Sequence, residues 1–289
     1  MKRSLRERLR QHVEVLALKI GERHIRRPGA LAAAARYIEE ALARSGGRSV
    51  RPQFYEVHGI KCANLEVELP GVGRPREILL VGAHYDTVEG SPGADDNASG
   101  VAAMIEIAAL LSRRRLRCTV RCVAFVNEEP PFFYSRKMGS AVYARAARSR
   151  GDDIKLMISL EMLGCYSARS MSQRYPPFLR FFYPDRGNFI AFISNLGSRH
   201  ELARLHEAFC SQCTFPSERL ASPAIVPGVS WSDQRSFWRA GFPAVMVTDT
   251  AFYRYRHYHA PTDTPEKLDY AAMESVTAGL ADAVTTLAN

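Results

Sequence analysis

Short, continuous apolar runs alternate along the chain with segments whose apolar residues recur at helical spacing. Strands alternating with helices are typical of a largely parallel sheet covered by helices on both faces. We therefore expect an α/β fold, a three-layer α/β/α sandwich with a mostly parallel, mixed central sheet. The apolar runs, which predict buried strands, cover residues 77–84, 118–129, 154–164, 188–195 and 244–250. The helical patterns cover residues 30–45, 98–114, 140–150, 200–212 and 269–288.

Residues 1–289 are predicted to form one domain, because we find no internal repeat and no low-complexity linker. A stretch without a regular pattern, at about residues 165–187, is expected to be a surface excursion. Residues 1–21 open with basic side chains and contain only a short, interrupted apolar run, which favours an amphipathic helix over a secretory signal. A cytoplasmic location is expected on that basis.

Composition and charge narrow the expected partners. The chain is 46% hydrophobic and 24% charged, which is ordinary for a globular protein, and no apolar stretch reaches the roughly 18 residues of a spanning helix. No membrane partner is therefore expected. The formal net charge of +9 would suit nucleic acid, but the arginines are scattered and lack interleaved aromatic residues for base stacking. No nucleic-acid partner is expected, and the oligomeric state is left open.

The six cysteines do not change this picture. Six in 289 residues are too sparse for a disulfide scaffold. Cys210 and Cys213 have the spacing of a redox or zinc pair, but there is no second pair of this kind, and we expect ordinary thiols.

Polar, metal-competent side chains follow four of the predicted strands at the point where each apolar run ends. In an open α/β sheet, ligands bind outside the carboxyl ends of the strands, so these side chains should meet at one edge. Imidazole and carboxylate groups are ligands of zinc and similar divalent ions. The residues in question are His84 with Asp86, Asn127 with Glu128 and Glu129, Glu161, and Thr248 with Asp249; Asp96 opens the helix after the first motif, and His257 and His259 follow the last strand.

The balance of charge indicates more than one ion. Three carboxylates with two histidines are too acidic for one catalytic zinc with three protein ligands, whereas two divalent ions carry four positive charges. The count predicts a two-metal site in which one carboxylate bridges ions about 3.5–4 Å apart.

Five segments in the same order resemble the co-catalytic di-zinc exopeptidases, the superfamily of the bacterial leucyl aminopeptidases, glutamate carboxypeptidase and the glutaminyl cyclases. They are "HYDTVEGSPGADDNASG", "NEEPPFF", "SLEMLGC", "SDQRSFWRAGFPAVMVTDT" and "HYHAPTDTPEKLD", within roughly residues 55–275. The resemblance implies the zinc-exopeptidase fold and zinc as the cofactor, with two ions per chain. It also implies a peptide substrate.

Carried onto this chain, the resemblance implies five metal ligands, with Asp96 as the bridging carboxylate. Glu161 departs from the pattern, because many members carry aspartate there; the longer side chain still offers a carboxylate. Gln234 stands where related sequences often have histidine, which changes a neighbouring group and not a ligand. The five implied ligands are His84, Asp96, Glu129, Glu161 and His259.

Two further residues carry catalytic expectations. Glu128 resembles the general base, and its neighbour Glu129 would project to the opposite side of an extended segment. Asp86 resembles the acid that orients the first histidine ligand, His84, through the second ring nitrogen.

Some positions near this edge remain open between roles. Asp95 or Asp96 could be a helix N-cap, and the family register selects Asp96 as ligand and leaves Asp95 and Asn97 to the turn. The register likewise selects His259 over His257, which on an extended chain would face the same side. Supporting or turn roles are expected for Asp233, Asp249 and Asp263, and a solvated position for Glu89; Phe132, Phe133 and the segment 178–183 line either a specificity pocket or the core.

The expected function is metal-dependent peptide hydrolysis, most simply removal of N-terminal residues by an aminopeptidase. A glutaminyl cyclase-like acyltransferase working with one zinc is the alternative within the fold. A non-catalytic binding protein on the same fold is the alternative from another class.

Overall fold

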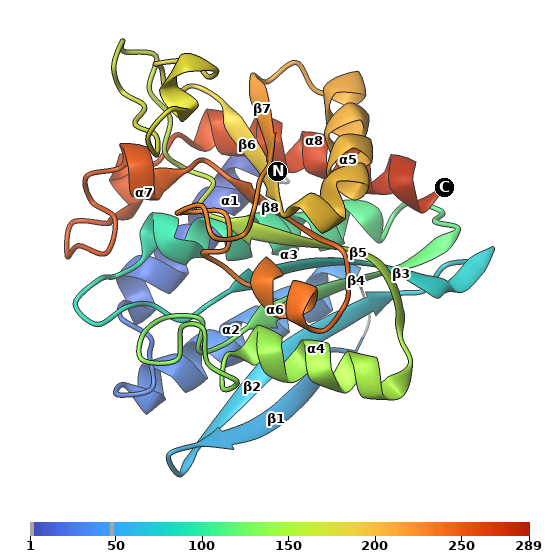
Figure 1. The fold of residues 1–289 in the computed structure, drawn as a ribbon. Helices are drawn as coiled ribbons and strands as arrows, with labels where there is room; N and C mark the ends of the chain where they lie inside the picture. Colours follow the sequence, from blue (N-terminus) through green and yellow to red (C-terminus); the bar gives the residue numbers. More distant parts are fainter. Residues whose placement is uncertain (1–2, 47–48) are drawn as a thin grey trace.

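The computed structural model describes residues 3–46 and 49–289. In this part of the chain eight strands form one sheet, in the order β1-β2-β4-β3-β5-β8-β6-β7 (Figure 1). The strands are β1 (Arg51–Val57), β2 (Ile60–Leu69), β3 (Arg74–His84), β4 (Cys118–Phe125), β5 (Asp153–Glu161), β6 (Ile190–Ser194), β7 (Ser217–Ala221) and β8 (Ala244–Thr248).

The sheet is mixed, with a parallel centre and antiparallel additions on both sides. β4, β3, β5 and β8 run parallel to one another, β1 and β2 add antiparallel strands beside β4, and β6 pairs antiparallel with β8. The predicted α/β sandwich with a mostly parallel, mixed sheet is confirmed. All five predicted strands are present. β1, β2 and β7 were not predicted because they lack a continuous apolar run; β1 and β7 are the edge strands, and β2 lies between β1 and β4.

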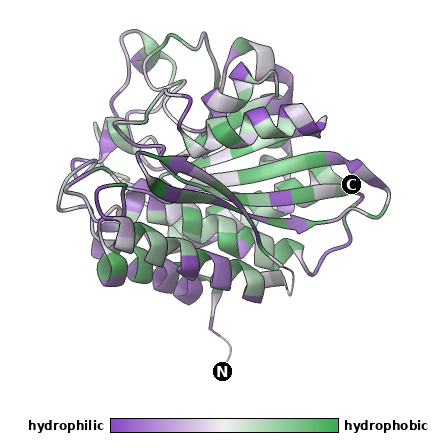
Figure 2. Ribbon diagram, turned by 90° about the horizontal axis from the view of Figure 1, so that it is seen from below, coloured by the Kyte–Doolittle hydropathy of each residue, from purple (hydrophilic) through white to green (hydrophobic). Residues whose placement is uncertain are grey.

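Helices cover both faces of the sheet, and neighbouring residues of β3 show how the two cores divide. Leu79 and Val81 belong to the core under α3 and α8, whereas Ile78 and Leu80 pack with Tyr143 of α4 on the other face. Figure 2 shows that the central strands are largely apolar while the helices alternate between apolar and hydrophilic residues. The helices are α1 (Leu5–Glu14), α2 (Pro28–Gly46), α3 (Gly100–Leu111), α4 (Gly139–Arg150), α5 (Arg199–Gln212), α6 (Gln234–Arg239), α7 (Ala251–Arg254) and α8 (Tyr270–Ala288).

Five short helical segments complete the description of the elements. They are η1 (Val15–Ile20), η2 (Ala94–Ser99), η3 (Leu179–Phe181), η4 (Leu196–Ser198) and η5 (Pro265–Lys267). Of these, η2 leads directly into α3 and carries Asp96, while η3 is the regular element within the predicted excursion at residues 165–187.

The chain starts with the amphipathic helix that its sequence predicts. Ser4 caps α1 in a capping box with Glu7, and Leu9 and Val13 are buried against the rest of the molecule. In the described residues we find no helix both long enough and apolar enough to cross a membrane.

Candidate metal centre

The carboxyl ends of the parallel strands bring the predicted site residues together. His84 is the last residue of β3 and Glu161 the last residue of β5, while Glu128 and Glu129 follow β4. All of these side chains are buried, and so is Asp96. This arrangement agrees with the prediction that the polar groups after separate strands meet at one edge of the sheet.

A first group of metal-competent atoms surrounds the imidazole of His84. Its Nε2 lies 3.3 Å from Oδ1 of Asp96 and 3.4 Å from Oε2 of Glu161. The extra methylene of Glu161 does not carry its carboxylate away from the group, and the Ser232 hydroxyl donates a hydrogen bond to Oε2. Residue 161 can therefore join the group despite its longer side chain.

A second group shares Asp96 and uses its other oxygen. Nε2 of His259 lies 3.1 Å from Oδ2 of Asp96 and 3.3 Å from Oε1 of Glu129. In each group of three, one possible ligand atom per residue lies within 4.8 Å of the other two. Asp96 thus stands between two three-residue groups and presents one oxygen to each.

The unmet bonding capacity of these atoms fits cations. His84 Nε2, Asp96 Oδ1 and Glu129 Oε1 are buried and have no hydrogen-bond partner in the described part of the chain. Burial first, and then the neighbouring carboxylates, raise the pKa of Glu128 well above its ordinary value and that of Glu129 to about 7. Divalent cations would supply both the missing partners and the missing positive charge.

Glu128 stands apart from both groups. Its Oε2 lies 4.0 Å from Nε2 of His84, so it faces the first group without joining it. Its neighbour Glu129 belongs to the second group. The adjacent glutamates therefore face different groups of the cluster. Strand alternation is not the cause, because both lie beyond the end of β4 and their consecutive N–H groups point to the same Asp86 carboxylate.

Asp86 contacts more than the histidine that it was expected to orient. The Nδ1 atom of His84 is hydrogen-bonded to the backbone carbonyl of Asp86 at 3.2 Å, and the nearer carboxylate oxygen lies 3.7 Å away. The carboxylate instead accepts the backbone N–H groups of Glu128 and Glu129. Asp86 therefore orients His84 mainly through its main chain and uses its side chain to fix the glutamate pair.

Asp263 supports the backbone at Asp96 in a similar way. Its carboxylate accepts the backbone N–H groups of Asp95 at 2.9 Å and of Asp96 at 3.1 Å, and it also accepts the Tyr255 hydroxyl. Burial raises the pKa of Asp263 to about 6 despite these bonds. Asp263 therefore supports the site by fixing the backbone that carries Asp96.

Asp95 and Asn97 tie the same turn to the end of β5. The Asp95 carboxylate accepts the N–H of Gly164, and the Asn97 side chain donates to the Leu160 carbonyl and accepts the N–H of Met162. The small residue at position 100 is required here, because a Cβ on Gly100 would lie 2.7 Å from the Leu160 carbonyl oxygen.

Arg23 is a supporting residue that the sequence did not reveal. Its side chain is fully buried and its guanidinium donates to five backbone carbonyls. Burial lowers its pKa to about 10, although nearby carboxylates oppose that shift. No spacing or apolar pattern marks this arginine, because its partners are main-chain atoms. The five carbonyls belong to Leu16, Gly21, Tyr85, Pro92 and Gly93.

The two candidate histidines near residue 258 do not lie on an extended segment, and this expectation was wrong. His259 has a left-handed backbone with φ of 56°, within a turn, and its ring stacks on Tyr258 with centroids 3.8 Å apart. His257 is directed elsewhere and is hydrogen-bonded to Thr262. The turn therefore directs the two histidines to different partners, whereas an extended chain would have placed both on the same side.

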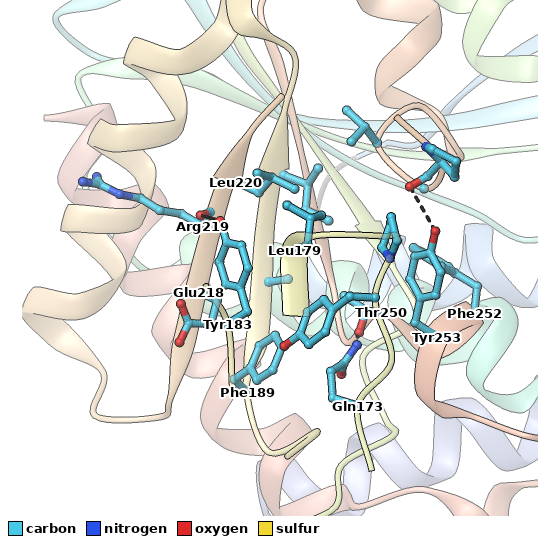
Figure 3. Close-up of a pocket in the computed structure, with 17 residues that line it drawn as sticks. Gln173, Leu179, Tyr183, Phe189, Glu218, Arg219, Leu220, Thr250, Phe252 and Tyr253 are labelled. Atoms are coloured by element: carbon cyan, nitrogen blue, oxygen red, sulfur yellow. Dashed lines mark hydrogen bonds between the residues drawn. The ribbon is translucent and has the colours of Figure 1, made fainter. Parts of the chain in front are cut away.

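One cavity borders the site, and a second lies beside β6 and β7. One of about 240 Å³ is lined by Asp86 and Glu129 together with Phe132. The other, of about 50 Å³, is an apolar slot lined by Leu179 and Tyr183 beside β6 and β7 (Figure 3). Phe132 and part of the segment 178–183 thus line cavities, whereas Phe178, Phe181 and Phe182 are exposed.

Comparison with known proteins identifies the family. The model of peptidase family M28 matches residues 64–284. The chain belongs to peptidase family M28. The match confirms the predicted superfamily. It also confirms the prediction of a metal-dependent peptidase. Protein YfbL of Escherichia coli K12 is 37% identical over 95% of this chain and 86% of its own length.

This M28 chain has the same fold as several solved structures. BSAP, a zinc aminopeptidase from Bacillus subtilis, superimposes with a TM-score of 0.77 at 14% identity, over 99% of this chain and 96% of BSAP. The glutaminyl cyclase of Fimbriiglobus ruber superimposes with a TM-score of 0.71 at 20% identity, over 97% and 94% of the two chains. At these identities the likeness concerns the fold alone.

Proposed function

We propose that this M28 chain is an aminopeptidase that binds two zinc ions, one in each three-residue group, with Asp96 as the shared ligand. The observation that carries the proposal is the position of Asp96, whose two oxygens face His84 and His259 separately. The other proposed ligands are Glu161 for the first ion and Glu129 for the second. Peptide is the proposed substrate.

When bound, zinc ions lower the pKa of an associated water toward neutrality and polarise a substrate carbonyl. Glu128 is the proposed general base and later the acid that protonates the leaving amine. Its buried carboxylate faces His84 without belonging to either ligand group. Its carboxylate would hold the transferred proton between the two steps.

The acidic surroundings support the preference for substrates with a free N-terminus. A free N-terminal amine would bind close to the zinc ions, beside the carboxylates of Glu128, Glu129 and Glu161. Of three tyrosines near the site, Tyr253 donates to the Pro227 carbonyl and Tyr255 to Asp263. Tyr258, stacked on His259, is therefore the proposed donor to the developing oxyanion.

A glutaminyl cyclase-like acyltransferase is the second candidate, favoured by the shared fold of the Fimbriiglobus ruber enzyme. The two candidates differ in metal content and product. One tightly bound zinc with cyclisation of N-terminal glutamine peptides would favour the cyclase. A non-catalytic binding protein is disfavoured because all five ligand positions and the base carry competent side chains.

The experiment combines metal analysis with a panel of amino-acid anilides, free peptides and N-terminally blocked peptides. We expect about two zinc ions per chain and release of N-terminal residues from unblocked substrates only. The Glu128→Ala variant should retain metal and lose activity by roughly 10²–10⁴-fold, while Glu39→Ala, at an exposed position on α2, should match the wild type. A zinc-loaded protein that cleaves no unblocked substrate would contradict the aminopeptidase, and an active Glu128→Ala variant would contradict the mechanism.

A further inference from the structure

The excursion after β5 carries an exposed cluster of phenylalanines. We call residues 169–186 the aromatic finger. Phe178, Phe181 and Phe182 in this finger have 74%, 68% and 79% of their surface exposed, and Met171 has 84% exposed. Single exposed apolar residues are common on proteins, but a contiguous group of large ones marks an interaction surface.

The base of the aromatic finger is firmly attached, so the exposure at its tip is a feature of an ordered segment. The Gln173 side chain accepts hydrogen bonds from Thr250 and Arg254, and the backbone N–H of Gln173 donates to the Asp185 carbonyl. Near the tip, the Tyr183 hydroxyl donates to the Arg219 carbonyl of β7.

The short turn η3 sorts the apolar side chains of the finger into two sets. Leu179 and Tyr183 line the apolar slot against β6 and β7 (Figure 3), whereas Phe178, Phe181 and Phe182 remain in solvent. The slot of about 50 Å³ is too small to take the three exposed rings as well. Leu179 and Tyr183 thus hold the turn in place. The three exposed phenylalanines remain free to contact another surface.

Positively charged side chains flank the exposed phenylalanines. The finger contains four arginines and one aspartate, a net charge of +3, and the aspartate is already hydrogen-bonded to Ser170. Arg180 lies between the phenylalanines and its guanidinium sits 4.8 Å from the centre of the Phe181 ring. The four arginines are Arg169, Arg174, Arg180 and Arg186, all exposed.

We propose that the aromatic finger docks this protein on an anionic lipid surface, with the phenylalanines entering the interface and the arginines contacting lipid phosphates. Apolar rings with flanking basic residues are the composition that binds such interfaces, and guanidinium groups pair with phosphate oxygens in a bidentate manner. The expectation of no membrane partner came from the lack of a spanning segment, and peripheral docking needs none. The proposal is independent of the proposed catalytic function.

The shape and charge of the finger favour lipid over the other possible occupants. The finger protrudes from the end of the molecule that carries β6 and β7 (Figure 1), whereas sites for small ligands and peptide side chains are concave. In a symmetric dimer the same patch would face its copy, which would place Arg180 and its neighbours opposite identical charges. An anionic bilayer offers apolar depth and opposite charge together.

The test is cosedimentation of the full chain with vesicles of phosphatidylcholine alone and of phosphatidylcholine mixed with phosphatidylglycerol. We expect binding only to the anionic vesicles, weakened by salt. The triple variant Phe178→Ser, Phe181→Ser, Phe182→Ser should reduce partitioning by at least roughly tenfold. Replacing Arg174 and Arg180 by glutamine should reduce it about fivefold for each arginine. Phe54→Ser is the matched control, because Phe54 is 55% exposed on β1, the opposite edge strand of the sheet.

Each other outcome decides against the proposal. Wild-type protein that stays in the supernatant with anionic vesicles overturns it, as does a triple serine variant that binds like the wild type. A triple variant that converts a dimer to a monomer with unchanged vesicle binding would assign the rings to a protein interface. Hydrolysis of short soluble peptides should be unaffected; its loss with unchanged vesicle binding would assign the rings to the substrate site. Repeating the assay with Glu128→Ala separates docking from catalysis.

Discussion

The carboxylate of Asp86 accepts the backbone N–H of Glu128 at 3.0 Å and that of Glu129 at 3.1 Å. A side chain from the segment after β3 therefore fixes both acids after β4. The Asp86→Asn variant would point an N–H₂ group at one of these N–H donors and misplace the pair. We expect kcat to fall roughly 10–100-fold with a similar loss of zinc affinity, measured by steady-state kinetics and zinc titration.

The control for Asp86 is Asp153→Asn, at the amino-terminal end of β5, away from the cluster and exposed. It should leave kcat and zinc affinity at wild-type values. Equal losses in both variants would show that the effect is general destabilisation, and wild-type behaviour of Asp86→Asn would contradict the positioning role.

The shared position of Asp96 predicts an asymmetry in metal content among variants. Replacing His84 or His259 by alanine removes a ligand from one three-residue group only, so each variant should retain about one zinc ion. Asp96→Asn weakens both groups and should retain less than either single-group variant. The measurement is zinc per chain after dialysis against a weak chelator; retention of both ions by Asp96→Asn would contradict the bridge.

The strand-end residues could be predicted because each is tied to a strong local signal. His84 ends an apolar run that folds as β3, and Glu161 ends the run that folds as β5, so parallel pairing alone brings them together. The identification of Asp96 and His259 depended on the family resemblance, since Asp96 lies at a non-helical kink before α3 and His259 lies in a turn. Their roles as ligands, like the single domain of residues 1–289, stay predictions.

The supporting contacts could not be read from the sequence because they involve main-chain atoms. The orientation of His84 by a carbonyl, the two amides held by Asp263 and the carbonyls held by Arg23 follow from the path of the backbone. The type of a residue does not reveal which main-chain atoms its side chain will contact. The prediction for His257 and His259 failed for a related reason. It assumed an extended chain, in which both rings would face the same side, but the backbone turns at His259.

Arg23 joins the amino-terminal segment to the loop that carries the site. Its Nη2 donates to the carbonyl of Gly93 at 2.9 Å, immediately before η2 and Asp96. Arg23→Met would leave buried carbonyls without donors, at about 1–3 kcal/mol each. We expect the free energy of unfolding to fall by more than about 3 kcal/mol, measured by urea denaturation, with a parallel loss of zinc affinity.

A lysine at position 23 should not rescue stability, because an ammonium cannot reproduce the planar fork that reaches several carbonyls. Arg26→Met is the matched control: its side chain is 69% exposed and pairs with Glu89 on the surface. It should change the free energy of unfolding by less than about 1 kcal/mol. A fully stable Arg23→Lys variant would show that charge, rather than the guanidinium geometry, is what the loop requires.

Glu106 of α3 gives stability a predictable pH dependence at a distance from the metal cluster. Burial alone would raise its pKa, but hydrogen bonds from His12 and Arg8 outweigh burial and hold the pKa below the ordinary 4.5. Since the folded pKa is lower than the unfolded one, this contribution is present above about pH 4.5 and is lost as the pH falls through the lowered value. Glu106→Gln should therefore destabilise the protein by about 1–3 kcal/mol near neutral pH, with the difference from wild type shrinking in acid. Urea denaturation across this range checks the sign, with Glu274→Gln, partner of the exposed Arg6, as a control that should show little effect at any pH; a difference that grows in acid would contradict the assignment.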